Sequence, residues 1–124
     1  MLQRHYLEPE NMFSRRRDGQ SIYTPIVVIQ GADHVHLYFS GRTSTLPSGE
    51  LAGKGDMRAQ LRQVCENIKT GLENAGAGFQ DVVRTVTYTV DVDEHNRHWD
   101  VRFEYFTPPP PHKHPHRREP VRGP

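Results

Sequence analysis

Apolar and polar positions change their spacing along this chain, and each change indicates a different element. β-Branched and aromatic residues fill the runs IYTPIVVIQ and VHLYFSG, which the turn residues GADH separate, so we predict a β-hairpin over residues 22–41. Pro25 cannot donate a backbone hydrogen bond, and we expect it at the start or on an edge of the first strand. Residues 1–20 are polar and show neither a period of 2 nor one of 3.6. We therefore expect a loosely ordered N-terminal arm there.

A helical period begins after the loop sequence RTSTLPSGELAGKG. Asp56 is a residue type that caps the first turn of a helix, and Gly76 suits the left-handed conformation that ends one. Between them apolar residues recur at spacings of three and four, namely Met57, Leu61, Val64, Ile68 and Leu72. The spacing predicts an amphipathic helix with one apolar face.

A third strand and a second helix follow the first helix. The run DVVRTVTYTVDV alternates, with Val82, Arg84, Val86, Tyr88 and Val90 on one side. From about Asp93, helical spacing relates Asn96, Trp99, Phe103 and Phe106 up to the prolines after Thr107. The order ββα then βα predicts an α+β fold, with two helices on one face of a mixed sheet. The other face then needs a partner, so we expect a homo-oligomer with ligand sites between subunits.

Composition supports one small domain in which either part of the chain is disordered or subunits share the burial of apolar surface. The chain has 124 residues, about the length of one domain, but only 34% hydrophobic residues. Its 16 basic and 15 acidic residues give a formal charge of +1, so we expect neither a nucleic acid nor a membrane partner. The single Cys65 excludes an intramolecular disulfide, and without a signal-like or membrane-spanning run we expect the cytoplasm.

Several strings resemble the Rid (YjgF-like) family when their order and spacing are taken together. They are LYFSG (37–41), GELAG (49–53), the stretch from QLRQV to VDVD (60–93) and FEYFTPP (103–109). The resemblance implies a homotrimer of chorismate-mutase-like α+β subunits with clefts between neighbours. It also implies a deaminase-type activity, hydrolysis of reactive 2-imino or 2-enamino acids to 2-keto acids and ammonia, without a metal or an organic cofactor. Some members of the family are described as endoribonucleases of the L-PSP type.

The resemblance also implies candidate site residues. Ser40 matches the hydroxyl that lines the family's cleft and Tyr23 matches an aromatic residue of its first strand, so these two are the catalytic candidates. Gly41, Arg42 and Trp99 are the substrate-binding candidates. Arg42 stands where the deaminases usually have Gln, and Trp99 where they have Asn, so that its large ring could partly fill the cleft.

The chain departs from the family after Pro109. The deaminases have there a Pro-Ala-Arg-Ser type strand with a carboxylate-binding Arg, and a later strand with a Glu that positions water. Here the chain reads PPPPHKHPHRREPVRGP, which is not strand-like and matches neither residue. Moved one base forward, codons for His112 to Glu119 can spell the strand-like Thr-Ser-Thr-Leu-Ile-Val-Glu, so we infer a frameshift near Pro111. We divide the chain into an arm (1–20), a Rid-like domain (21–109) and an aberrant tail (110–124).

Several functions stay open at this point. The leading expectation is an intersubunit cleft that binds a small carboxylate or carbonyl metabolite, with imine hydrolysis as its activity. The missing Arg favours a non-catalytic metabolite-binding trimer instead, and a ribonuclease or an inactive truncated product are further alternatives. Alternating histidines in HKHPH can ligate metals, but the interleaved prolines and the frameshift favour no native metal site.

Overall fold

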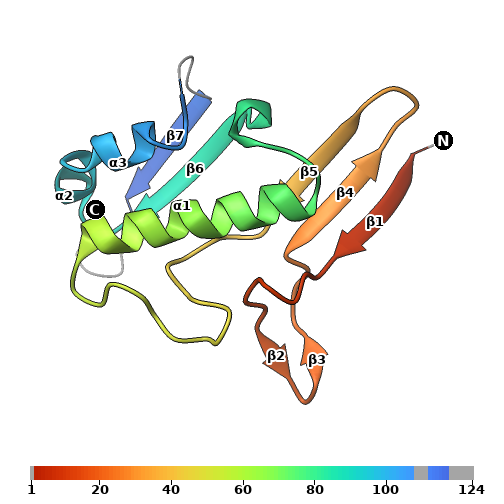
Figure 1. The fold of residues 1–124 in the computed structure, drawn as a ribbon, viewed down its shortest axis with the longest axis horizontal. Helices are drawn as coiled ribbons and strands as arrows, with labels where there is room; N and C mark the ends of the chain where they lie inside the picture. Colours follow the sequence, from red (N-terminus) through yellow and green to blue (C-terminus); the bar gives the residue numbers. More distant parts are fainter. Residues whose placement is uncertain (1, 108–111, 118–124) are drawn as a thin grey trace.

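A computed structural model describes residues 2–107 and 112–117 of the chain (Figure 1). Its strands are β1 (Gln3–Leu7), β2 (Arg16–Arg17), β3 (Gln20–Ser21), β4 (Ile26–Gln30), β5 (Val35–Phe39), β6 (Arg84–Thr89) and β7 (His112–Arg117). Its helices are α1 (Met57–Asn74), α2 (Val92–Asn96), α3 (Trp99–Phe103) and the short 3-10 turn η1 (Phe79–Asp81). The predicted α+β class is confirmed. Within the described ranges, no helix combines the length and the apolar character needed to span a membrane.

The predicted hairpin is confirmed as β4 and β5, and it lies in an antiparallel sheet of order β1-β4-β5. Pro25 directly precedes β4, as expected for a residue without a backbone donor. The third strand corrects the expected loose arm, because β1 pairs with β4 along its whole length. Four of its five side chains are exposed. Backbone pairing with β4 orders β1, and such pairing does not require a regular spacing of apolar residues.

A second part of the expected arm is also ordered. The strands β2 and β3 pair in antiparallel register around a turn at Asp18 and Gly19, both with positive φ, 52° and 80°. Two successive positive φ values define the type I′ turn that favours Asp-Gly in tight hairpins. This hairpin projects from the body of the molecule (Figure 1).

The helix α1 forms where its pattern predicts it. The Asp56 carboxylate accepts a hydrogen bond from the Ala59 amide at 3.1 Å, which caps the first turn, and Gly76 follows the helix with φ of 74°. Close packing explains a glycine in the last turn of this helix. A methyl group at Gly71 would lie 2.6 Å from the Phe39 ring of β5. The contact lets α1 lie close to the end of the hairpin.

The single second helix expected from about Asp93 is instead two short helices, α2 and α3. The backbone leaves the helical region at His98, with φ −112° and ψ 24°. His98 is held there by a 3.2 Å contact between its Nε2 and the Glu94 carboxylate. The break turns α3 so that Val101 is completely buried against the α1 residues Leu61 and Cys65.

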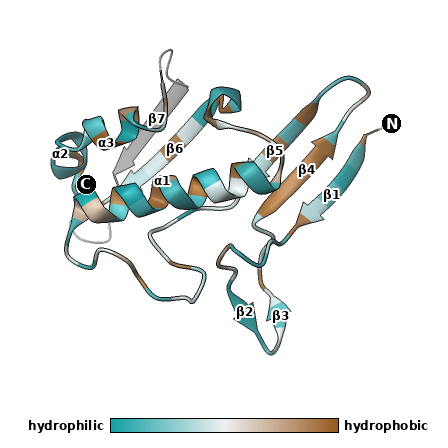
Figure 2. Cartoon of the chain, in the orientation of Figure 1, coloured by the Kyte–Doolittle hydropathy of each residue, from teal (hydrophilic) through white to brown (hydrophobic). Residues whose placement is uncertain are grey.

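The core is small and the outward face of β6 is apolar. The main cluster consists of Leu61, Cys65, Val101 and Phe106. In β6 the threonines are half-buried, whereas Val86 and Tyr88 on the other face are 38% and 65% exposed. In the first sheet Tyr6 and Tyr38 lie on either side of Val27 in one row and are about 60% exposed. The expected bare face is therefore present, and hydrophobic residues are seen along β4 and β5 (Figure 2).

The tail after Pro109 contains a strand, which corrects the expectation from its sequence. Residues His112–Arg117 form β7, parallel to β6, with Arg84 opposite His112 and Thr89 opposite Arg117. Backbone hydrogen bonds to an available strand suffice for such pairing, whatever the side-chain pattern. Residues 108–111 and 118–124 lie outside the described residues, so the frameshift and the boundary after Pro109 stay predictions.

Candidate ligand-binding cleft

A cleft of about 400 Å³ opens where the β4–β5 hairpin meets the loop before α1. It is lined by four of the five predicted site residues, Tyr23, Ser40, Gly41 and Arg42. Tyr23 comes just before β4, and the other three follow directly after β5. The antiparallel pairing of the two strands is what brings residues 17 positions apart in sequence to one end of the sheet.

Trp99, the fifth predicted residue, does not line this cleft. It lies on α3, where its ring centroid is 5.8 Å from that of Phe103 and 6.4 Å from that of His95. The guanidinium carbon of the buried Arg102 lies 5.6 Å from the same ring. Within one chain Trp99 thus belongs to an aromatic group beside β6, and a role for it in a cleft completed by a neighbouring subunit stays a prediction.

Pro25, the residue just before the paired part of β4, fixes the backbone of Ser40. The backbone N–H of Ser40 donates to the carbonyl oxygen of Pro25 at 2.9 Å, which extends the ladder past the Ile26–Phe39 pair. Its hydroxyl lies 3.4 Å from the same carbonyl oxygen. Because Pro25 and Ile26 are buried, Ser40 has a fixed backbone position at the edge of the cleft.

Arg42 is fixed by three hydrogen bonds to neutral oxygens. Its Nη2 donates to the Ser40 hydroxyl at 2.7 Å, its Nε to the Ser40 carbonyl at 3.3 Å, and its Nη1 to the Phe13 carbonyl at 3.3 Å. The side chain is half-buried. A guanidinium held at three of its donors has a defined orientation, which favours two-pronged recognition of an anion.

The far wall of the cleft is tied to α1 by one amide side chain. Asn67 Nδ2 donates to the carbonyl oxygens of Thr43 and Thr45, both at 2.8 Å, and Gln63 in turn donates to Asn67 Oδ1 at 2.9 Å. The two threonine hydroxyls lie 2.7 Å apart. The helix therefore holds the loop that supplies the hydroxyl groups of the cleft.

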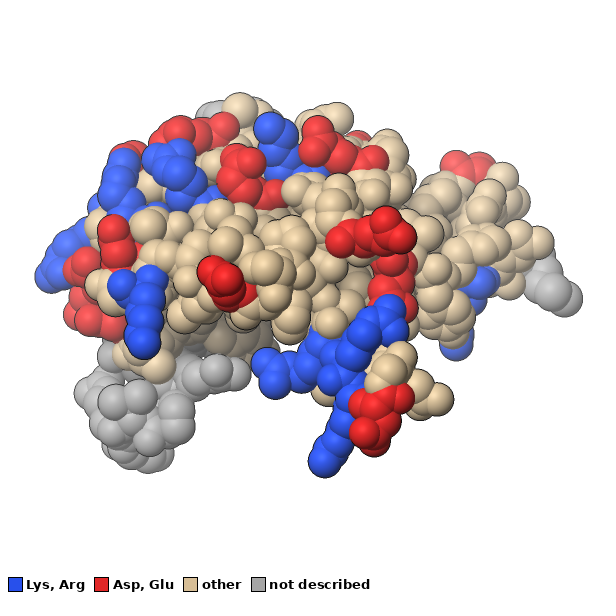
Figure 3. Space-filling view, turned by 60° about the horizontal axis from the view of Figure 1, so that its bottom comes forward, with Lys and Arg blue, Asp and Glu red and all other residues tan. Residues whose placement is uncertain are grey.

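The lining carries positive charge and no described carboxylate. Arg15 and Arg42 line it, together with neutral residues, and neither Asp nor Glu is among the described lining residues. Arg15 reaches it from the base of the β2–β3 hairpin, where its carbonyl accepts from the Ile22 amide at 3.1 Å. In the view of Figure 3, Lys and Arg side chains gather on the lower projection, whereas both signs intermingle over the upper surface. An anionic ligand is the chemistry that suits such a lining.

Five lining residues were not among the site residues expected from sequence: Phe13, Arg15, Thr43, Thr45 and Asn67. Phe13 and Arg15 belong to the supposed arm, and Asn67 is a polar residue on a helix read for its apolar face. The Asp-Gly pair at residues 18–19 is the signal for the hairpin that places Arg15. Asn67 offered no comparable signal, because its role depends on the path of the loop.

In the described part of the chain, no group of three or more His, Cys, Asp or Glu side chains is placed to hold a metal ion. The described residues place no carboxylate or histidine in the cleft, so its donor set is suited to an organic anion rather than to a cation. The side chains of the HKHPH segment lie outside the described features.

The element order and the packing of α1 and α3 beside the sheets define a chorismate-mutase-like α+β protein (Figure 1). The family model described as endoribonuclease L-PSP matches residues 21–121, which is most of the chain. The chain belongs to this family, whose members include the Rid and YjgF-like proteins.

Curated relatives agree with this assignment over part of their length. A RutC family protein of Pyrococcus horikoshii is 39% identical over 71 residues, which is 56% of each chain. A RutC family protein of Pyrococcus abyssi is 42% identical over 59 residues, 48% of this chain and 46% of that one. The match thus spans about half the length of these relatives.

Solved structures show the same fold at lower identity. The Rid family protein YyfA of Yersinia pestis has a TM-score of 0.77 at 24% identity, with 94% of this chain and 86% of that chain covered. RidA of an Antarctic Psychrobacter has a TM-score of 0.72 at 23% identity, with 90% and 84% covered. The fold of the family is therefore retained over nearly all of this chain.

Proposed function

We propose that the cleft binds a small carboxylic acid that carries a neighbouring carbonyl or imine carbon. The observation that carries this proposal is the orientation of Arg42, a guanidinium fixed by neutral oxygens at the edge of a cleft of about 400 Å³. Tyr23 supplies an aromatic surface and Thr43 and Thr45 supply hydroxyl groups for the rest of such a ligand. Ligand sites commonly combine an apolar surface with a few fixed polar groups.

Hydrolysis of 2-imino acids is the reaction to test first. Water adds to the carbon of the C=N bond, that bond breaks, and the nitrogen leaves as ammonia while a 2-keto acid forms. The family membership of the chain supports this activity. The reaction needs a group that orients the water, and the described lining of the cleft contains no carboxylate for that role.

The lack of such a group favours a second candidate, a binding protein of the same fold without catalysis. Both candidates use the same cleft and the same guanidinium. They differ in whether the bound imine is turned over faster than it hydrolyses in water.

Self-association as a homotrimer belongs to the same proposal. Support comes from the row of Tyr6, Val27 and Tyr38 and from the exposed Val86 on β6, because a domain of this size does not normally leave so much apolar surface uncovered. A neighbouring subunit would then complete the cleft.

Ammonia release from freshly generated 2-aminoacrylate tests the catalytic candidate, and NMR titration with 2-oxobutyrate tests binding. Acceleration above the spontaneous rate supports the deaminase, whereas binding without acceleration supports the binding protein. Absence of both would contradict the proposed cleft function, and light scattering in the same buffer measures the number of chains per particle.

A further inference from the structure

We propose that Arg42 is the residue that contacts the anionic group of the ligand, and that Ser40 is the positioning residue that orients it. The proposal rests on the function proposed above, since it assigns roles within the same cleft. It also reverses the roles expected from sequence, in which Ser40 was the catalytic candidate.

The Ser40 hydroxyl is already engaged. It has one hydrogen to donate, and the Pro25 carbonyl lies 3.4 Å away to receive it. It also accepts the 2.7 Å hydrogen bond from Arg42 Nη2, which leaves a single lone pair. A hydroxyl in this state has no free proton for a ligand carboxylate, so its main effect is on the guanidinium.

Arg42 keeps free donors of the kind that Ser40 lacks. A guanidinium has five N–H groups, and three of them are hydrogen-bonded to described residues, one each on Nε, Nη1 and Nη2. Ser40 occupies the edge formed by Nε and Nη2 with its carbonyl and hydroxyl oxygens. Among the described residues, one N–H group of each terminal nitrogen has no partner. Two such donors are what a carboxylate requires for a two-pronged contact.

The charge of Arg42 is also uncompensated within the described residues. Arg58 is paired with Asp100, Arg62 with Glu104 and Arg16 with Glu8. Arg42 contacts only neutral oxygens, and no described ion pair includes it. A half-buried cation without a carboxylate attracts an anion more strongly than a paired or fully solvated one. Arg15, on the same cleft, adds a second positive charge.

The geometry therefore assigns to this chain a carboxylate-binding residue that lies on the loop after β5. With Arg42 in this role, carboxylate binding needs no guanidinium from the strand that follows the helices. The Arg expected in that strand has no match in the sequence. The ligand class that fits is a small monocarboxylate, with the carboxylate at Arg42 and the carbonyl or imine carbon toward the hydroxyls of Thr43 and Thr45.

A pair of probes that differ only in charge tests the assignment. We would titrate the full chain with 2-oxobutyrate and with 2-oxobutanamide, its neutral amide, and follow backbone amide signals by NMR. For Arg42→Gln we expect roughly 10- to 100-fold weaker binding of the carboxylate, the range for loss of a charge-assisted contact, and little change for the amide. Arg42→Lys keeps the charge without the planar fork and should recover only part of the loss.

Ser40 variants separate positioning from direct contact. Ser40→Ala should weaken carboxylate binding several-fold, whereas Ser40→Thr, which keeps the hydroxyl, should restore it. Arg62→Gln is the matched control, because it removes a guanidinium of α1 that lies away from the cleft. Thermal unfolding of each variant identifies any that fails to fold. In that case carboxylate binding is compared between the wild type and the conservative variants Arg42→Lys and Ser40→Thr.

Three results would overturn the assignment. Equal affinity of the wild-type chain for acid and amide, or unchanged carboxylate binding in Arg42→Gln, would exclude Arg42 while leaving the cleft function intact. A wild-type chain that binds neither probe would refute the proposed function itself, and this assignment with it.

Discussion

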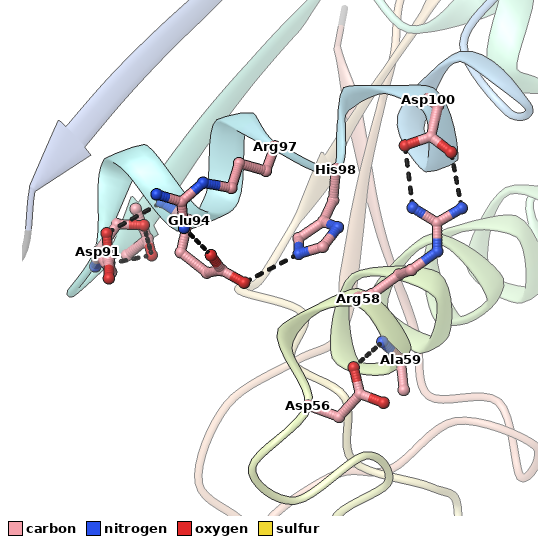
Figure 4. A network of polar contacts seen from close by, with 9 residues as sticks. Asp56, Arg58, Ala59, Asp91, Glu94, Arg97, His98 and Asp100 are labelled. Atoms are coloured by element: carbon pink, nitrogen blue, oxygen red, sulfur yellow. Dashed lines mark hydrogen bonds and ion pairs between the residues drawn. The ribbon is translucent and has the colours of Figure 1, made fainter.

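Arg58 and Asp100 join the two helices that carry the core by a pair of parallel hydrogen bonds. The Nη1–Oδ1 distance is 3.0 Å and the Nη2–Oδ2 distance is 2.6 Å. Dashed lines mark both contacts in Figure 4. One turn further along α1, Arg62 makes the same two-pronged contact with Glu104, at 2.9 and 3.1 Å. These pairs set the register of α1 against α3 over the buried Val101.

Acid should weaken this contact in a defined range of pH. Hydrogen bonding from Arg58 lowers the pKa of Asp100 to about 2, and Arg62 lowers the pKa of Glu104 in the same way. A carboxyl whose pKa is lower in the folded state than in the unfolded state stabilises the fold at higher pH. That contribution should be complete above about pH 5 and lost as the pH falls toward about 2. Urea unfolding across this range measures it.

Asp100→Asn should flatten part of this pH dependence, and Asp93→Asn is the matched control. Asp93 is exposed and forms no ion pair with another described residue. An Asp100→Asn protein with the full wild-type acid dependence would show that this pair does not contribute to the fold.

Gly71→Ala should destabilise the fold although alanine is the better helix former. The added methyl gains about 1 kcal/mol of helix propensity. It would also meet the Phe39 ring at 2.6 Å, and overpacking of this kind costs about 1–3 kcal/mol. We expect a net loss of up to about 2 kcal/mol in the free energy of unfolding, measured with urea. Glu73→Ala, exposed on the same helix, should change it little, and a Gly71→Ala chain as stable as that control would contradict the contact.

Cys65 should react slowly with iodoacetamide in the folded protein. Its side chain is almost fully buried, and burial raises the pKa of its thiol to about 11. Only a small fraction is then thiolate near pH 8, and the reagent also lacks access. Mass spectrometry should show alkylation only after addition of denaturant, and rapid labelling of the folded chain would contradict the burial.

Charges at exposed apolar positions of β5 and β6 should prevent self-association. Val86→Lys and Tyr38→Lys place an ammonium group at exposed positions of β6 and β5, so neither disturbs the core of the single chain. If the trimer interface includes these two positions, light scattering should give the mass of one chain for each variant and of three chains for the wild type. Arg17→Glu, a charge change on the projecting hairpin, is the control. An unchanged mass with Val86→Lys would place the interface elsewhere.

Sequence patterns predicted those elements whose own residues show a cap, a regular apolar spacing or a β-branched run. The helix α1 has a cap at Asp56 and a regular apolar spacing, and the hairpin of β4 and β5 has β-branched runs around a turn. The strand β1 has no such signal, because its exposed side chains follow no apolar period and its order comes from pairing with β4. The sequence of β7 likewise has no apolar period, and the strand pairs with β6 in parallel register.

The candidate cleft was predictable only as far as it follows the hairpin. Tyr23, Ser40, Gly41 and Arg42 lie at one end of two paired strands, so the strand prediction already brings them together. Asn67 and Phe13 come from distant segments, and their positions depend on how the loop and the N-terminal residues pack. Trp99 was placed at the cleft by a match in sequence order; within one chain it does not line the cleft, and its role beside a neighbouring subunit stays a prediction.

The absence of a side chain at Gly71 has an effect beyond packing. Phe39, whose ring occupies that space, is followed directly by Ser40, and Ser40 orients Arg42. We therefore expect a larger side chain at this position, in the last turn of α1, to shift Phe39 and, through Ser40, the guanidinium of Arg42. A search for altered ligand preference should accordingly include position 71, although it lies on the helix and not in the cleft.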